Sequence, residues 1–354
     1  MLVTVASWGA ARFGPVRLDA DAMLAAMLVL PRAETESLLD PDDVRRAVEA
    51  AMVDVSSGRS SMPLRIAALL PERDALLAAM PAYLPATDSL AAKLVSVFPH
   101  NAASDRPTHM AVVVVFDATS GEPTALVDGT SITTARTAAG SALSAQLLAR
   151  PEARVLAILG TGVQARAHAS ALVRVGTFSE VLVAGRDPAK ARSLAAELAA
   201  TLGLPVSACD SFGAACESAD VICATTHSPE PVVQRQHLRP GVHVASVGLS
   251  GSGREVDSGT VADAIVVVES RQAALAPHPA GAPDLRMPIE EGLIGPDHIH
   301  AELGELVTGA RPGRTRDDEI TLYKSVGIAA QDVAVAAMVV AGARARGLGT
   351  ELVM

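Results

Sequence analysis

The chain is poor in aromatic residues and in positive charge. Aromatic side chains make up only 2% of its 354 residues, so the stacking platforms that single-stranded nucleic acids require are scarce. Lysine and arginine number 29 against 39 aspartate and glutamate, which gives a formal net charge of −10. This balance argues against a phosphate backbone or an anionic membrane as the main partner. We therefore expect no nucleic acid and no membrane partner, and a small-molecule enzyme fits the composition better.

Cysteine is also rare. The three cysteines, Cys209, Cys216 and Cys223, form no C-x-x-C pair, which fits neither a disulfide framework nor a zinc site. The sequence therefore predicts no bound metal. The longest apolar stretch near the start, residues 22–30, is too short to span a bilayer and follows acidic rather than basic residues. We accordingly expect a cytoplasmic protein.

Apolar residues are abundant enough for two domains. They make up 49% of the chain, which allows a sizeable core. Residues 1–36 lack a clear periodicity and predict an N-terminal extension of unclear role. Residues 37–140 predict a mixed α+β domain. The elements expected there are a helix around residues 44–52 capped by Asp40 or Asp42, strands near residues 90–98, 111–116 and 123–127, and a helix over residues 136–150.

Apolar strands alternate with helices over residues 141–321. This alternation predicts a doubly wound parallel sheet of the Rossmann type with helices on both faces, so the fold class is α/β. A helical pattern over residues 322–346 is expected to pack back on the first domain, which residues 322–354 would complete. The expected strands are residues 155–159, 180–184, 206–208, 221–224 and 243–247, with helices over residues 164–175 and 188–202.

A glycine-rich segment follows the first of these strands. Gly160 can form the tight turn, and Gly162 lets backbone N–H groups approach a pyrophosphate at the start of the helix. A glycine-rich turn without a ligand is the alternative, but the strand and helix on either side favour a nicotinamide dinucleotide. The expected cofactor contacts in this segment are Gly160, Thr161, Gly162, Val163 and Gln164.

The end of the second strand of this unit bears on the choice between NAD and NADP. NAD-binding chains usually place an aspartate or glutamate there, which accepts from the ribose hydroxyls. This sequence has Gly185, Arg186 and Asp187. A guanidinium complements a 2′-phosphate and a carboxylate repels it, so NADP(H) is favoured. The alternative, in which Asp187 reaches the ribose and Arg186 is merely solvated, keeps NAD(H) open.

Several motifs in a fixed order make the chain resemble the ornithine cyclodeaminase/mu-crystallin family, from Leu38 to Thr350. Six ordered blocks are specific for this family, and less specific for one reaction. The blocks are residues 62–65 (MPLR), 92–101 (AKLVSVFPHN), 128–133 (DGTSIT), 136–139 (RTAA), 160–165 (GTGVQA) and 323–329 (YKSVGIA) with Asp332.

The resemblance implies a homodimer built through the non-Rossmann domain and an active site between the two domains. It also implies residue roles. Arg65 corresponds to the arginine that binds the substrate carboxylate, Lys93 to the catalytic lysine, and Arg136 to an arginine near substrate and cofactor. The remaining implied contacts are Val326 for the substrate, and Thr108, His109, Val163, Gln164, Thr226, Val247 and Ser325 for the cofactor.

These roles agree with the chemistry of the side chains. A small amino or imino acid needs a planar bidentate cation for its carboxylate, and Arg65 or Arg136 supplies one. A lysine partly removed from water beside two arginines would have its pKa lowered. Lys93 could then exchange a proton with a substrate nitrogen near neutral pH.

Members of the family divide among cyclodeaminases, alanine dehydrogenases and reductases of cyclic ketimines. Cyclodeaminases and alanine dehydrogenases carry an aspartate in the loop after the fifth strand of the Rossmann domain. This sequence has Ser250 there, as the ketimine reductases do. Glu255 or Asp257 could instead place a carboxylate in the active site. A serine cannot act as a carboxylate base near pH 7. A deamination requires several proton transfers and would lack its best base, whereas reduction of an imine requires a single proton and depends less on that base.

The sequence therefore predicts NAD(P)H-dependent reduction of Δ1-pyrroline-2-carboxylate or Δ1-piperideine-2-carboxylate to proline or pipecolate. Three alternatives stay open. They are an ornithine or lysine cyclodeaminase with bound NAD, an alanine dehydrogenase, and a non-catalytic binding protein on the same fold.

Overall fold

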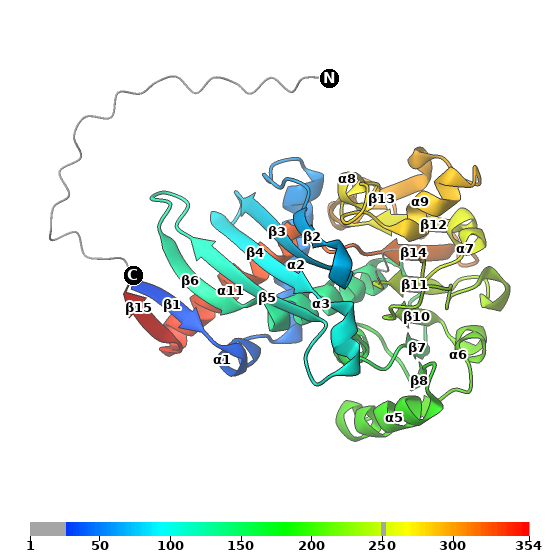
Figure 1. Ribbon diagram of the computed structural model, residues 1–354. Helices are drawn as coiled ribbons and strands as arrows, with labels where there is room; N and C mark the ends of the chain where they lie inside the picture. Colours follow the sequence, from blue (N-terminus) through cyan, green and yellow to red (C-terminus); the bar gives the residue numbers. More distant parts are fainter. Residues whose placement is uncertain (1–25, 249–252, 354) are drawn as a thin grey trace, which may run out of the picture.

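The computed structural model describes residues 26–248 and 253–353, which form two units around two separate sheets (Figure 1). In the first, which we call the mixed-sheet unit, seven strands lie in the order β15-β1-β6-β5-β4-β3-β2. Its elements are β1 (Ala26–Leu30), α1 (Arg32–Glu36), α2 (Pro41–Ser56), β2 (Ile66–Leu70), β3 (Ala75–Leu84), β4 (Ser89–Val97), β5 (His109–Phe116), β6 (Pro123–Asp128), α3 (Gly129–Leu148), α11 (Ala329–Arg346) and β15 (Thr350–Val353).

The second, which we call the Rossmann unit, holds eight parallel strands in the order β13-β12-β14-β11-β10-β7-β8-β9. The predicted α/β class with a parallel Rossmann sheet is confirmed. Its elements are β7 (Val155–Leu159), α4 (Val163–Val175), β8 (Glu180–Ala184), α5 (Pro188–Leu202), β9 (Val206–Ala208), α6 (Phe212–Ser218), β10 (Val221–Ala224), β11 (His243–Ser246), α7 (Ser258–Asp263), β12 (Ala264–Val268), α8 (Arg271–Ala274), α9 (Pro283–Glu290), β13 (Ile299–Glu302), α10 (Leu303–Val307) and β14 (Ile320–Lys324).

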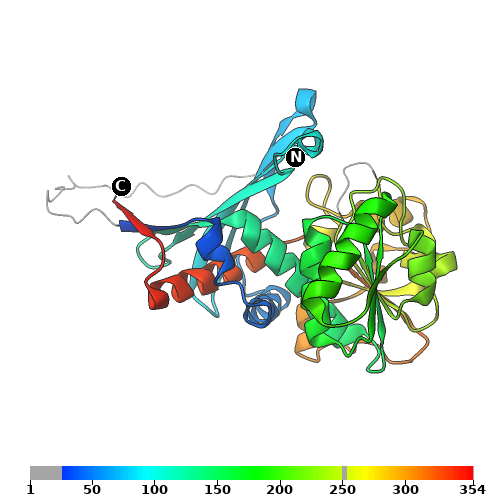
Figure 2. The ribbon, with the colours of Figure 1, turned by 90° about the horizontal axis from the view of Figure 1, so that it is seen from below.

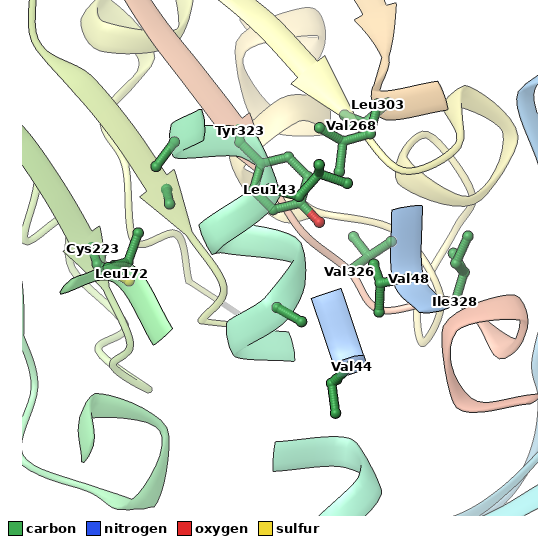
Figure 3. Close-up of a cluster of buried hydrophobic side chains, with 14 of the residues drawn as sticks. Val44, Val48, Leu143, Leu172, Cys223, Val268, Leu303, Tyr323, Val326 and Ile328 are labelled. Atoms are coloured by element: carbon green, nitrogen blue, oxygen red, sulfur yellow. The ribbon is translucent and has the colours of Figure 1, made fainter. Parts of the chain in front are cut away.

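Helix α3 joins the two units. Asp128 caps it by accepting a hydrogen bond from the backbone N–H of Ser131 at 3.0 Å. The helix packs on β5 and α2 on one side and on α4 and β11 on the other. Figure 3 shows the apolar cluster at this junction, where Leu143 of α3 lies against Tyr323 of β14, with Val44 and Val48 of α2 nearby. Burial of such side chains fixes the two sheets relative to each other.

The helices of the mixed-sheet unit lie along one face of its sheet (Figure 2). Helix α11 packs on β3, β4 and β5, and also on α2 and α3. Side chains of β3 to β5 that point away from these helices are therefore open to solvent, among them Leu77, Leu94 and Val112. In the described ranges, none of the helices combines the length and the apolar character needed to cross a bilayer.

The extension predicted over residues 1–36 is wrong for its last part. Residues 26–36 form β1 and α1, and β1 pairs with β6 in parallel and with β15 in an antiparallel arrangement. Strand β1 has partners on both sides and reads as a short apolar run without alternation. Such runs carry little periodic signal, which is why this strand was not predicted.

The C-terminal helix begins later than predicted. Residues 320–324 form β14, a fully buried strand between β11 and β12, although the sequence placed residues from 322 onward in a helix of the first domain. A strand buried on both faces shows no alternation and cannot be told from a buried helix by its apolar pattern. The break comes at Gly327, whose φ is +67°, and α11 starts at Ala329.

Two further differences concern the mixed-sheet unit. Helix α3 begins at Gly129 rather than at residue 136, because the Asp128 cap offsets the weak helix propensity of the glycine and threonines that follow. Strands β2 and β3 were not predicted. They are rich in alanine, and β3 contains Pro81, and both features disfavour a strand when the sequence is read alone.

Candidate active site

A cavity of about 1120 Å³ lies between the helix-covered face of the mixed sheet and the carboxyl edge of the parallel sheet. It opens where strand order reverses, since β7 and β10 are neighbours and their connections leave in opposite directions. Ligands of doubly wound sheets bind at such a switch point. Twelve residues predicted for the site line this cavity: Arg65, Lys93, Thr108, His109, Arg136, Gly162, Val163, Gln164, Thr226, Val247, Ser325 and Val326.

The glycines after β7 shape a site for a diphosphate. Gly160 has a φ of +122°, and a Cβ atom there would lie 2.6 Å from Thr225 Oγ1, so only glycine fits this turn. Gly162 caps α4 and lines the cavity, and a Cβ atom there would meet nothing within 4 Å. An anion can therefore approach the first turn of α4, whose N–H groups have no partners within the helix. The residues present fit a dinucleotide.

The segment after β8 lies outside the cavity wall. Gly185 packs on Thr161, because a Cβ atom on this glycine would lie 2.7 Å from Thr161 Cγ2. The Asp187 carboxylate caps α5 and accepts hydrogen bonds from the backbone N–H groups of Ala189 at 2.9 Å and Lys190 at 3.3 Å. Arg186 is exposed and forms no ion pair with any residue described by the structure. This arginine is thus available to a ligand.

Glu255 and Asp257, the two carboxylates that could take the place of an aspartate at Ser250, make other contacts in the structure. Buried Glu255 accepts from the hydroxyls of Thr226 and Ser246, each at 2.8 Å, and from the N–H of Gly248 at 2.8 Å. Asp257 caps α7. Neither lines the cavity, and Ser250 itself lies outside the described residues. Glu255 therefore supports the loop that carries Thr226 and does not reach a substrate.

Lys93, Asp332 and Arg136 form a buried charge cluster. The Lys93 Nζ lies 2.7 Å from Asp332 Oδ2, and the Arg136 Nε lies 3.1 Å from Asp332 Oδ1. Lys93 also donates to the Thr133 hydroxyl at 3.3 Å, and Arg136 donates to the Gln331 side-chain oxygen at 3.1 Å. One carboxylate on α11 thus holds two cations, one from β4 and one from α3, at the cavity wall.

The surroundings of Lys93 bring its pKa close to neutral pH. Burial lowers the pKa of Lys93 to about 8; the Asp332 charge opposes this shift, and the charges of Arg136 and Arg65 add to it. For Asp332, burial alone would raise the pKa, but Lys93 and Arg136 outweigh it and leave the pKa below its ordinary value. Asp332 is therefore ionised near neutral pH, and Lys93 can gain or lose a proton there.

Arg65 reaches the same place from the segment before β2. Its NH2 donates to the backbone oxygens of Val326 at 2.7 Å and Gly327 at 2.6 Å. Burial is the main cause that lowers the pKa of Arg65, and the Arg136 charge adds to the shift. A guanidinium remains charged in proteins despite such shifts, and the remaining N–H groups of Arg65 can face an acid.

A pair of histidines lies where the two units meet. His109, at the start of β5, and His227, after β10, have ring centroids 5.6 Å apart, and both line the cavity. Burial lowers the pKa of His109 to about 4, and the neighbouring His227 contributes. His109 is therefore neutral at physiological pH. The Thr108 hydroxyl lies 3.0 Å from its Nδ1.

Asp332, Glu269 and His227 lie in or next to the site, and none of the three was assigned a role from the sequence. Asp332 belongs to one of the family motifs, and it is the only acidic residue in a mainly apolar helix. Such a charge is seldom buried unless it is paired, so its position could have indicated a role in the site. Glu269 directly follows strand β12, and His227 is the third residue after strand β10. Residues at the carboxyl edge of a parallel sheet often line a ligand site, so this position could have indicated their involvement.

Comparison with known proteins agrees with this arrangement. A sequence profile of the ornithine cyclodeaminase/mu-crystallin family matches residues 25–347. A Δ1-pyrroline-2-carboxylate reductase of Bacillus cereus is 34% identical over 328 residues, which cover 92% of this chain and 99% of that protein.

Solved structures show the same likeness. Thermococcus litoralis Δ1-pyrroline-2-carboxylate reductase, in complex with NADH and L-proline, superposes with a TM-score of 0.89 at 35% identity, covering 92% of this chain and 100% of that chain. An archaeal alanine dehydrogenase dimer with bound NAD has a TM-score of 0.86 at 30% identity, covering 92% and 99%. The ketimine-reductase side of the resemblance is thereby confirmed. The chain belongs to the ornithine cyclodeaminase/mu-crystallin family.

Proposed function

We propose that this protein reduces a small cyclic imino acid, Δ1-pyrroline-2-carboxylate or Δ1-piperideine-2-carboxylate, to proline or pipecolate with a reduced nicotinamide dinucleotide. One observation carries the proposal. A buried lysine with a pKa of about 8 faces the same cavity as Gly162, and Arg65 and Arg136 lie beside it. The related reductase bound to NADH and L-proline supports the same assignment.

The two arginines would bind the substrate carboxylate. Arg65 keeps donors free after its two bonds to backbone oxygens, and Arg136 keeps donors free after its bonds to Asp332 and Gln331. Charge-assisted bonds in a cavity of low dielectric are stronger than the same bonds in water. An acid held in this way presents its C=N bond toward Lys93.

Lys93 would supply the proton. A bound reduced nicotinamide would supply the hydride for the imine carbon, and the Lys93 ammonium would give one proton to the ring nitrogen, which would become a secondary amine. The lysine is left neutral and recovers its proton from solvent. Asp332 keeps the Nζ in place through its 2.7 Å contact and favours the charged form of the lysine before transfer.

For the cofactor we propose a preference for NADPH over NADH. Arg186 supports it, because this exposed guanidinium has no ion-pair partner within residues 26–248 and 253–353 and a guanidinium suits a 2′-phosphate. The carboxylate of Asp187 is engaged in capping α5, which leaves it less available to ribose hydroxyls. The two related structures hold NADH and NAD, and the KM values of this chain for NADPH and NADH distinguish the two cofactors.

We further propose a homodimer formed through the open face of the mixed sheet. Exposed apolar side chains gather there: Leu77 is 48% exposed, Leu94 39%, Met110 42% and Val112 40%. Leu94 and Val112 lie opposite each other on β4 and β5. A contiguous apolar patch of this kind is typical of protein interfaces, and the related alanine dehydrogenase is a dimer.

The reaction is tested by NADPH absorbance with each of the two cyclic imino acids, and in reverse with proline. We expect consumption of NADPH with at least one imino acid and no ammonia from ornithine or lysine in the presence of NAD. Ammonia release from ornithine without imine reduction would show a cyclodeaminase instead. Reduction of pyruvate with ammonia as the only activity would show an alanine dehydrogenase, and no turnover would leave a binding protein.

Replacing Lys93 by methionine keeps the side-chain length and removes the proton. We expect kcat for imine reduction to fall by about 10²-fold or more, with cofactor affinity measured by NADPH fluorescence unchanged. In the unchanged protein, imine reduction should decline as the pH rises through about 8, since the donor is then neutral, and proline oxidation should rise over the same range. A K93M protein with full turnover would remove the lysine from the chemistry.

Replacing Arg186 by alanine tests the cofactor preference. We expect the KM for NADPH to rise by about tenfold, and the KM for NADH to stay nearly constant, because only the phosphate loses its partner. Arg192→Ala is the matched control, since it removes another exposed guanidinium close by, from helix α5, which begins two residues after Arg186. Equal effects of R186A on both cofactors would contradict the NADPH assignment.

Replacing Val112 by glutamate tests the dimer. A charge in the centre of the proposed interface should convert the protein to a monomer, as measured by size-exclusion chromatography with light scattering. Leu293→Glu, which changes an apolar residue 57% exposed in the Rossmann unit, should leave the mass unchanged. A V112E protein that keeps the dimer mass, or an unchanged protein that is a monomer, would rule out this interface.

A further inference from the structure

The turn between β14 and α11, residues 325–327, lies between the two units and touches both arginines of the proposed site. The backbone oxygens of Val326 and Gly327 accept from the Arg65 guanidinium. A Cβ atom on Gly327 would overlap the guanidinium of Arg136, so this arginine lies directly on the glycine. The position of the turn therefore sets the position of both guanidinium groups.

Glu269 fixes this turn from the Rossmann side. Directly after β12 and fully buried, it accepts from the Ser325 hydroxyl at 2.5 Å, the Val326 N–H at 3.2 Å and the Gly327 N–H at 3.2 Å. Its side chain does not line the cavity, so it cannot contact a bound substrate there. All three partners are donors, and an ionised carboxylate is the side chain that only accepts.

We propose that Glu269 is a positioning residue for the substrate carboxylate, acting through the turn at residues 325–327 on Arg65 and Arg136. The inference rests on the proposed function, because it needs an acid bound by these arginines. It connects the two units, since Glu269 belongs to the Rossmann unit while Arg65 and Arg136 come from the mixed-sheet unit. Affinity for the acid thus depends on a residue that never touches the acid.

The expected effect follows from donor and acceptor chemistry. In Glu269→Gln one oxygen becomes an NH₂ group, which cannot accept from the turn and instead faces one of its N–H groups. The turn must shift or leave a donor unpaired, and the backbone oxygens that hold Arg65 shift with it. The proposed diphosphate site, around Gly162 and the start of α4, follows strand β7 and should not change.

The experiment measures binding of pyrrole-2-carboxylate, a planar acid that imitates the imine, to the full chain saturated with reduced cofactor. We expect the Kd for this acid to rise at least about tenfold in E269Q, a change of about 1.4 kcal/mol. The Kd for the cofactor alone should rise less than the Kd for the acid, because Ser325 is only one of the expected cofactor contacts. In turnover, KM for the imino acid should rise more than kcat falls, because the carboxylate is bound in ground state and transition state alike.

Asp220→Asn is the matched control. Asp220 also holds a turn through two backbone N–H groups, those of Arg154 at 2.8 Å and Val155 at 3.0 Å, at the opposite edge of the parallel sheet. This variant should lower the melting temperature without changing the Kd for pyrrole-2-carboxylate. If D220N weakens acid binding as much as E269Q does, the effect is general and the proposal is wrong.

The remaining outcomes separate the proposal from the proposed function. If the unchanged protein binds the cofactor but not the acid, both the proposed function and the role of Glu269 are wrong. If it binds the acid and E269Q binds it equally well, only the role of Glu269 falls. Should E269Q fail to fold, Gly327→Ala decides: its methyl group displaces Arg136 while Glu269 stays in place, and unchanged acid affinity in G327A would overturn the proposal.

Discussion

The contact on which the site depends is the carboxylate of Asp332 shared between Lys93 and Arg136. Three charges removed from water cost several kcal/mol each, and only close pairing offsets that cost. Without Asp332, the lysine and two arginines would repel one another at the cavity wall. With it, Lys93 has a pKa of about 8 beside the two guanidinium groups, and a single pocket can hold an acid and exchange a proton.

The fold brings these groups together from distant parts of the chain. Lys93 lies on β4, Arg136 on α3 and Asp332 on α11, which follows β14 of the other sheet. The chain enters the Rossmann unit after α3 and leaves it through the turn at residues 325–327. Arg136 lies in α3, ahead of the first crossing, and Ser325 and Val326 lie in the turn of the second. The proposed carboxylate site is therefore built at the junction of the two units, beside the switch point where Gly162 begins α4.

Much of this could be predicted from the sequence. Strands β7, β8, β9 and β10 were predicted with the bounds that the structure has, because they are short apolar runs separated by strong helices and by glycine. Of the twelve predicted residues that line the cavity, eight belong to the ordered motifs. Strand β14 and the role of Glu269 could not be predicted, since a buried strand has no alternation and a buried carboxylate has no partner visible in the sequence.

The central claim is that an acid held by Arg65 and Arg136 presents its ring nitrogen to Lys93. A crystal structure with the nicotinamide cofactor and pyrrole-2-carboxylate tests it most directly. The account predicts the carboxylate on the two guanidinium groups and the ring nitrogen within about 3.2 Å of the Lys93 Nζ. A ring nitrogen turned away from Lys93, or a carboxylate bound elsewhere in the cavity, would contradict it.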